Sequence, residues 1–174
     1  QGKVVGISPG PVITMYEYAP APGIKISRIV GLSDDLSMAL KATSIRVVGP
    51  IPGKAAIGVE LPNDRREMVA IRAILESEAF TVSSAPLTIA LGKDTTGQPV
   101  GANLARMPHL LIAGATGTGK SVCLNTILAS LLFRNTPEDT RLLLIDPKRI
   151  ELKSYENIPH LLHPVVCDAK MATR

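Results

Sequence analysis

Hydrophobic and polar positions alternate, or recur with helical spacing, in the first part of the chain, and these patterns predict several short elements. The alternation in residues 12–18 (VITMYEY) predicts a half-buried strand, which the turn-forming residues 19–23 (APAPG) terminate. Across residues 25–42 the apolar positions recur with a spacing of about 3.6, which predicts an amphipathic helix weakened at Gly31. Two short strands, and a strand end that runs into a short helix, are predicted at residues 45–48, 56–61 and 65–77.

The second part of the chain has the pattern of a linker followed by strands and one long helix. Small and polar residues at 81–86 (TVSSAP) have the composition of a linker. A helix is predicted from Gly119 to Arg134, because Asn135 and Pro137 follow as a C-terminal cap and a helix breaker. Apolar runs predict strands at 87–91, 109–113 and 141–145, and a hairpin-like turn is predicted at 92–100. The strand, helix and strand around Gly119 predict a β-α-β unit and therefore a parallel sheet.

Composition places the chain among ordinary globular proteins. Its 174 residues are 45% hydrophobic and 20% charged, which excludes a disordered tail or a collagen-like chain. Only three tyrosines and two phenylalanines are present, too few for an extended platform on which single-stranded bases stack. The net charge of +4 is compatible with a polyanionic partner, but the basic residues are scattered among acidic ones.

Cysteine usage and hydropathy exclude two further classes of protein. Cys123 and Cys167 form no C-x-x-C pair, so neither a zinc site nor a disulfide framework is indicated, and Cys123 is expected to be a small core residue. No apolar stretch approaches the roughly 18 to 20 residues that span a bilayer, and the first residues lack the order of a secretory signal. We expect a cytoplasmic segment that makes no membrane contact.

Residues 114–121 (GATGTGKS) match the phosphate-binding pattern G-x-x-x-x-G-K-[ST] at every fixed position. Glycines allow the backbone N–H groups to turn inward around phosphates, and the N-terminus of the following helix adds partial positive charge. Lys120 is then expected to reach the β and γ phosphates of a nucleoside triphosphate, and the Ser121 hydroxyl to bind Mg²⁺. The alternative, a plain glycine-rich turn with an exposed lysine, gives no reason for Lys-Ser to follow the glycines.

The acidic residues after the last predicted strand leave two interpretations open. Asp146, at the end of RLLLID, is placed to hold magnesium beside Ser121, and Glu151 is then the candidate base for the attacking water. Asp146-Pro147 is equally typical of a turn that ends a strand, with Lys148 and Arg149 as partners for the carboxylate.

Several segments in one order resemble the FtsK/SpoIIIE family of double-stranded DNA translocases. They are GPVITMYEYAPAPGIKISRI, VVGPIPGKAAIGVELPN, MPHLLIAGATGTGKSV, IDPKRIEL and YENIPHLLHPVV, which together cover nearly the whole chain. The resemblance implies an α/β fold with a small α/β domain at residues 1–85. A RecA-like P-loop NTPase domain with a parallel sheet would follow at residues 86–174. It also implies ATP hydrolysis by a homo-oligomer, a ring of six subunits around duplex DNA, in chromosome segregation at division or sporulation.

The resemblance also implies roles for individual residues. Lys120 is the catalytic residue, and Ser121 is the magnesium ligand. The nucleotide-binding residues are Gly114, Ala115, Thr116, Gly117, Thr118, Gly119, Lys120, Ser121 and Val122. In this family the magnesium-anchoring aspartate lies on a later strand than IDPK. The chain is therefore expected to be C-terminally truncated, to bind ATP and magnesium without efficient turnover, and to come from a parent protein with an N-terminal membrane anchor.

Two other functions remain open at this point. A coupling ATPase of the conjugation type would move single-stranded DNA instead of duplex. A non-catalytic assembly module would use residues 1–85 to pack a ring, because that region has core-like patterning but no cluster of chemically active residues.

Overall fold

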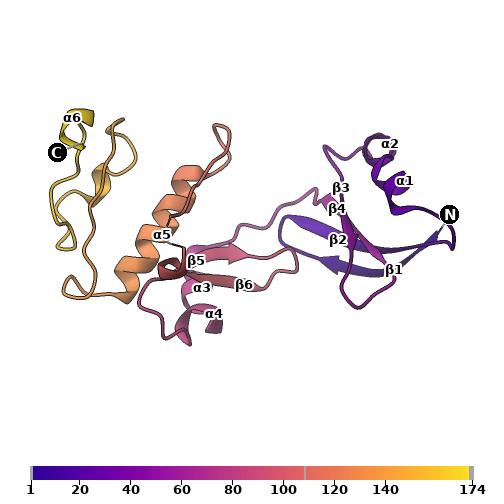
Figure 1. Cartoon of the computed structure of the whole chain (residues 1–174), viewed down its shortest axis with the longest axis horizontal. Coiled ribbons are helices and arrows are strands. Elements are labelled where there is room, and N and C mark those ends of the chain that lie inside the picture. The colour runs from indigo at the N-terminus through magenta and orange to yellow at the C-terminus, as the bar shows by residue number, and fades with distance from the viewer. Residues whose placement is uncertain (1, 108, 173–174) are drawn as a thin grey trace. The chain divides into compact units, whose positions relative to one another are not determined.

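The computed structural model describes residues 2–107 and 109–172, and it consists of two compact units (Figure 1). The first unit takes the chain up to Ala73 together with Gly92–Val100. The second takes Ile74–Leu91 and the chain from Gly101 onward. The predicted division of the chain at residues 85 and 86 stays a prediction, because compactness within one chain does not define independently folding domains.

The first unit is built on a four-stranded antiparallel sheet in the order β1-β2-β4-β3. Its strands are β1 (Gly2–Pro9), β2 (Ile13–Pro20), β3 (Arg46–Pro50) and β4 (Ile57–Pro62). The last three confirm the predicted strands. β1 was missed because a register shift between Val4 and Gly6 interrupts the alternation on which a prediction depends.

The predicted amphipathic helix of the first unit is two short helices, α1 (Ile26–Val30) and α2 (Ser33–Ala39). The break falls at Gly31, which is the C-cap of α1. This is the position at which the sequence predicted weakness, since glycine lowers helix stability.

An ion pair in the first unit joins a buried glutamate of β2 to the exposed Lys54. Glu17 is 8% exposed, and the ammonium of Lys54 donates to both of its carboxylate oxygens at 2.6 and 2.7 Å. Gly6 faces Glu17 in the register of β1 with β2, and a Cβ at this position would lie 2.8 Å from the carboxylate. Glycine therefore leaves the space that the paired charge occupies.

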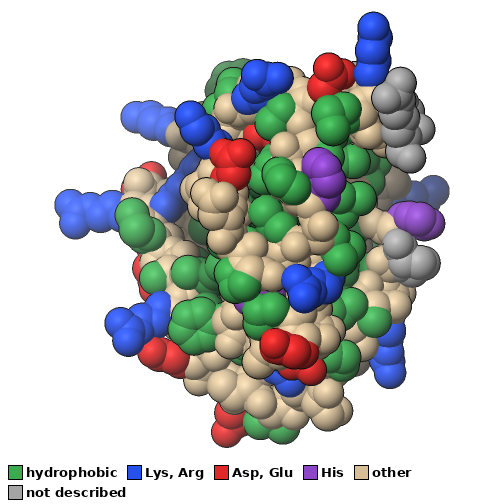
Figure 2. Space-filling model, turned by 90° about the vertical axis from the view of Figure 1, so that its left-hand side faces the viewer, with side chains coloured by type: hydrophobic (Ala, Val, Ile, Leu, Met, Phe, Trp, Pro, Cys, Tyr) green, Lys and Arg blue, Asp and Glu red, His purple; other side chains and the backbone are tan. Residues whose placement is uncertain are grey.

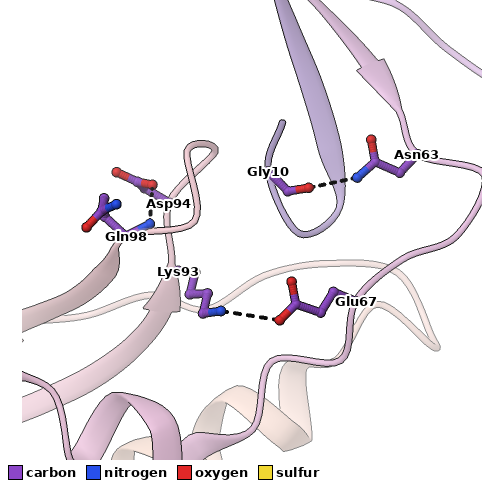
Figure 3. Close-up of polar contacts among 6 residues, drawn as sticks. All are labelled: Gly10, Asn63, Glu67, Lys93, Asp94 and Gln98. Carbon is purple, nitrogen blue, oxygen red and sulfur yellow. Dashed lines mark hydrogen bonds and ion pairs between the residues drawn. The ribbon is translucent and has the colours of Figure 1, made fainter. Parts of the chain in front are cut away.

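The hairpin of β5 (Thr88–Lys93) and β6 (Pro99–Asn103) confirms the predicted turn between them. Asp94 closes the turn by accepting the backbone N–H of Gln98 at 2.9 Å (Figure 3). Lys93 contacts Glu67 at 3.4 Å, and both residues belong to the first unit, which includes the tip of the hairpin. In the same unit Asn63 donates to the carbonyl of Gly10 at 2.8 Å.

The second unit is organised around the longest of its helices, α5 (Lys120–Arg134). The other helical segments near or in this unit are α3 (Ile71–Leu75), α4 (Glu78–Thr81), η1 (Leu104–Arg106), η2 (Lys153–Tyr155) and α6 (Ala169–Ala172). Within residues 2–107 and 109–172, no helix is long and apolar enough to cross a membrane.

Two hydrophobic clusters join α5 to its neighbours. Ile127 and Leu131 pack with Ile89 of β5, and the partly buried Cys123 lies against this cluster as expected. The second cluster consists of Leu128, Leu144 and Leu152. Because both clusters draw on α5, burial of its side chains determines where its two ends lie.

The predicted linker at residues 81–86 is held against the C-terminal end of α5. Arg134 donates to the carbonyl of Phe80 at 2.9 Å and to that of Ser83, and its guanidinium lies 5.5 Å from the centre of the Phe80 ring. Asn135 donates to the carbonyl of Pro86 at 3.0 Å. These contacts satisfy backbone carbonyls that a free linker would expose to water.

The predicted parallel sheet is not shown, because the regular sheets of the described residues are antiparallel. Residues 109–113 form no strand, and 141–145 form only two isolated parallel bridges, Leu142 with Leu161 and Ile145 with Val166. The continuous apolar run predicted burial on both faces, but Leu143 and Ile145 are 57% and 45% exposed. Figure 2 shows the face on which the C-terminal segment lies, with hydrophobic side chains gathered across it. A run of this kind buries both faces only where another layer covers each.

Replacing Ser130 by alanine is expected to destabilise the second unit by about 1–3 kcal/mol. Ser130 is fully buried, and its hydroxyl accepts the backbone N–H of Ala90 at 3.0 Å while donating to the carbonyl of Thr126. The variant leaves the Ala90 N–H buried without a partner. Urea unfolding followed by circular dichroism measures the loss, with the exposed Ser154→Ala as the matched control. Equal stability of the two variants would contradict this assignment.

Candidate functional site

Residues 114–119 form a loop that leads directly into α5, and the last two residues of the motif, Lys120 and Ser121, lie in the first turn of that helix. Gly117 and Gly119 have φ angles of 84° and 95°, in the left-handed region that glycine adopts without strain. Gly119 is the N-cap of α5, so the helix begins at Lys120. The predicted loop and helix are therefore present, whereas the strand expected before the loop is not regular.

The loop is closed tightly on itself at Gly114. Thr118 donates its hydroxyl to the carbonyl of Ala115 at 2.7 Å. A Cβ at Gly114 would lie 2.4 Å from this hydroxyl oxygen, so only glycine fits here without a shift. The fixed glycine positions of the motif thus have two separate causes, a close approach at Gly114 and backbone angles at Gly119.

The ammonium of Lys120 is held inside the loop. It donates to the carbonyls of Gly114 at 2.5 Å and Ala115 at 3.2 Å. The backbone bond from the N–H of Cys123 to the carbonyl of Gly119 opens α5, and the N–H groups before Cys123 lie in the first turn, which has no intrahelical acceptors. The Lys120 ammonium and the backbone N–H groups of the first turn of α5 therefore lie at one helix N-terminus. This set of donors fits a phosphate group.

Ser121 makes a contact that connects the loop to a distant part of the sequence. Its hydroxyl lies 2.6 Å from a carboxylate oxygen of Glu151, which is 30 residues further along the chain. Glu151 is the residue that the sequence indicates as a candidate base, and the structure places it beside Ser121. No sequence pattern predicts the hydrogen bond itself, because it depends on how residues 146–152 turn.

Asp146 organises that turn. Asp146 is 5% exposed, and its carboxylate accepts hydrogen bonds from four backbone N–H groups at 2.9 to 3.1 Å. The donors are the N–H groups of Lys148, Ile150, Glu151 and Leu152. A carboxylate offers about four acceptor positions, so these bonds use its capacity. Of the two interpretations of Asp146, the structure supports the strand-ending turn, with backbone N–H groups as partners in place of the neighbouring cationic side chains.

The same hydrogen bonds lower the pKa of Asp146 below its ordinary value. The N–H of Leu152 contributes most to this shift, with the N–H groups of Glu151, Lys148 and Ile150 adding to it. Burial raises the pKa and opposes them. The ionised form is therefore the one that the turn stabilises.

The described residues contain no group of three or more His, Cys, Asp or Glu side chains that could hold a metal ion. Magnesium is commonly bound through one or two protein groups together with phosphate oxygens and water. The pair of Ser121 and Glu151 fits this kind of site better than a metal cage made by protein alone.

Comparison with known proteins places both parts of the chain in one family. The model of the FtsK/SpoIIIE family matches residues 70–174, and the model of the FtsK alpha domain matches residues 1–63. The first match includes the loop, α5 and the turn at Asp146.

Curated relatives are similar over almost the whole chain. The DNA translocase FtsK of Brucella melitensis is 54% identical over 99% of this chain and 21% of its own length. That of Helicobacter pylori is 51% identical over 98% of this chain and 20% of its own length. That of Caldanaerobacter subterraneus is 52% identical over 99% of this chain and 24% of its own length. The chain therefore spans about a fifth of the length of these relatives.

Replacing Asp146 by asparagine is expected to lower the thermal stability of the chain at neutral pH, because an amide accepts the four N–H groups less well than a carboxylate. The folded pKa lies below the ordinary value of 3.8, so the stabilisation is present above that value and is lost as the pH falls through the folded pKa.

Thermal melts by circular dichroism between neutral pH and about pH 3 measure this difference. The gap between Asp146→Asn and the wild-type chain is expected to narrow in the acid range, whereas the exposed Asp64→Asn shows little difference throughout. A gap that stays constant into the acid range would show that the carboxylate charge is not what holds the turn.

Proposed function

The chain belongs to the FtsK/SpoIIIE family, and on this premise we propose that it is the nucleotide-binding portion of an ATP-driven motor that moves double-stranded DNA. The family model covers the loop, and the relatives are named DNA translocases. Because the chain spans only about a fifth of them, translocation is proposed for the whole protein and nucleotide binding for this part.

The observation that carries the proposal is the ammonium of Lys120, held in the glycine loop at the N-terminus of α5. We propose that Lys120 is the catalytic residue and exchanges the loop carbonyls for phosphate oxygens of ATP. Ser121 is the proposed magnesium ligand, and bound Mg²⁺ supplies neutralisation of charge on the phosphates. The proposed nucleotide-binding residues are those from Gly114 to Val122, which make up the loop and the first turn of α5.

The partners and assembly of the whole protein are proposed from the family. The net charge of +4 is compatible with duplex DNA as the partner. A ring of six subunits, a RecA-like domain with a parallel sheet from residue 86, and a role in chromosome segregation follow from the resemblance described above. A small α/β domain at residues 1–85 would contribute to the packing of that ring.

Replacing Lys120 by alanine is expected to weaken binding of Mg-ATP by about tenfold or more, since hydrogen bonds to charged groups contribute about 1.5–3 kcal/mol each. Fluorescence titration with a labelled ATP analogue measures the affinity. Lys153→Ala removes one exposed positive charge from the same unit and serves as the control. Wild-type affinity in Lys120→Ala would refute the proposed site.

In the full-length protein, linear duplex DNA is expected to stimulate ATP hydrolysis more strongly than single-stranded DNA of equal nucleotide content. Steady-state hydrolysis assays measure both, with Lys120→Ala as the background. Stimulation by single strands that equals or exceeds that by duplex would instead favour a coupling ATPase of the conjugation type.

A further inference from the structure

The hydroxyl of Ser121 donates a hydrogen bond to the carboxylate of Glu151. We propose that Glu151 is a positioning residue for the divalent metal that Ser121 binds. It accepts the Ser121 O–H and thereby leaves the oxygen lone pairs of that hydroxyl to the ion. This inference rests on the proposed function, and it adds a residue that the motif at 114–121 does not contain.

The chemistry of a hydroxyl requires such a partner. A serine hydroxyl has one donor and two acceptor positions, and a cation binds only the lone pairs. The hydrogen must therefore point elsewhere, and a carboxylate is the strongest acceptor available to it. Partners of this kind fix the orientation of a ligand and raise its basicity. The proton stays on Ser121 throughout, so no bond to hydrogen is broken.

The position of Glu151 is fixed although its side chain is exposed. Its own N–H donates to Asp146 at 3.0 Å, and the next residue, Leu152, is buried in the cluster with Leu128. Leu128 lies on α5, the helix that begins beside Ser121. The backbone at Glu151 is therefore held by Asp146 and by the cluster that includes a residue of α5, the helix that also carries Ser121. An unanchored side chain at the surface would lose most of this bond to competition by water.

A purely structural role for Glu151 predicts a different result. An anion beside the N-terminus of α5 stabilises the helix by interaction with its dipole, and its removal would lower the melting temperature alone. A positioning role predicts a change in how much magnesium improves nucleotide binding. Because a carboxylate also repels phosphates, its removal is expected to leave the affinity for metal-free nucleotide unchanged or to increase it.

The test uses the full chain and a fluorescent ATP analogue, titrated with magnesium or with EDTA. The ratio of the two dissociation constants, Kd in EDTA over Kd in magnesium, is the magnesium gain. Glu151→Gln is expected to reduce this gain by about tenfold, within the range typical of residues that support metal ligands. Glu156→Gln removes the same charge from an exposed position of the same segment and is expected to keep the wild-type gain.

Ser121→Ala supplies the coupling test. If Glu151 acts through the hydroxyl, then adding Glu151→Gln to Ser121→Ala produces no further loss of magnesium gain. A further loss of the same size in the double variant would overturn the proposal, because Glu151 would then act on the metal independently. Thermal melts of each variant verify that the chain is folded.

The remaining outcomes separate this inference from the proposed function. A wild-type magnesium gain in Glu151→Gln overturns the positioning role, whether or not the melting temperature falls, and leaves nucleotide binding intact. Failure of the wild-type chain to bind the analogue in either condition overturns the proposed function and this inference together. Loss of binding in Lys120→Ala with a reduced gain in Glu151→Gln supports both.

Discussion

The burial of one face of α5 is the constraint on which the second unit depends. Ile127 and Leu131 enter one cluster and Leu128 the other, so the helix cannot shift without opening both. The glycine loop ends at the N-terminus of this helix, and at the other end Arg134 donates to the carbonyl of Phe80 in the preceding chain. The position of the candidate site is therefore determined by apolar packing of α5, although the side chains of the site are polar.

The second determinant of where the site residues lie is electrostatic. Asp146 gathers four N–H groups around one carboxylate, and the turn that results includes Arg149 with a φ angle of 56°. Such an angle is unfavourable for a residue with a side chain, and it persists where surrounding bonds over-determine the backbone. The hydrogen bonds to Asp146 hold this turn, and the turn places Glu151 beside Ser121. Asp146 thus determines where Glu151 lies through the turn that it holds.

The sequence predicted local structure well where one element decides it. The helix from Lys120 to Arg134 and its end at Asn135 follow from periodicity and capping, and the hairpin turn follows from its glycine and aspartate. Residues 141–145 were mispredicted because a continuous apolar run describes burial on two faces, which depends on what neighbours it. The partner of Ser121 was equally beyond prediction, since a contact across 30 residues depends on tertiary structure.

Both of the side chains with a proposed catalytic or magnesium-binding role have a partner within the chain. Lys120 is bound to the carbonyls of Gly114 and Ala115, and Ser121 to Glu151. In the nucleotide complex proposed above, the Lys120 ammonium would exchange these carbonyls for phosphate oxygens, so its charge would not be left unpaired at either stage. In the proposed site the Glu151 carboxylate and the metal would use different parts of the Ser121 hydroxyl, so Ser121 would keep Glu151 as its partner. On this proposal the lysine changes its partners on binding, whereas the serine keeps the partner that it already has.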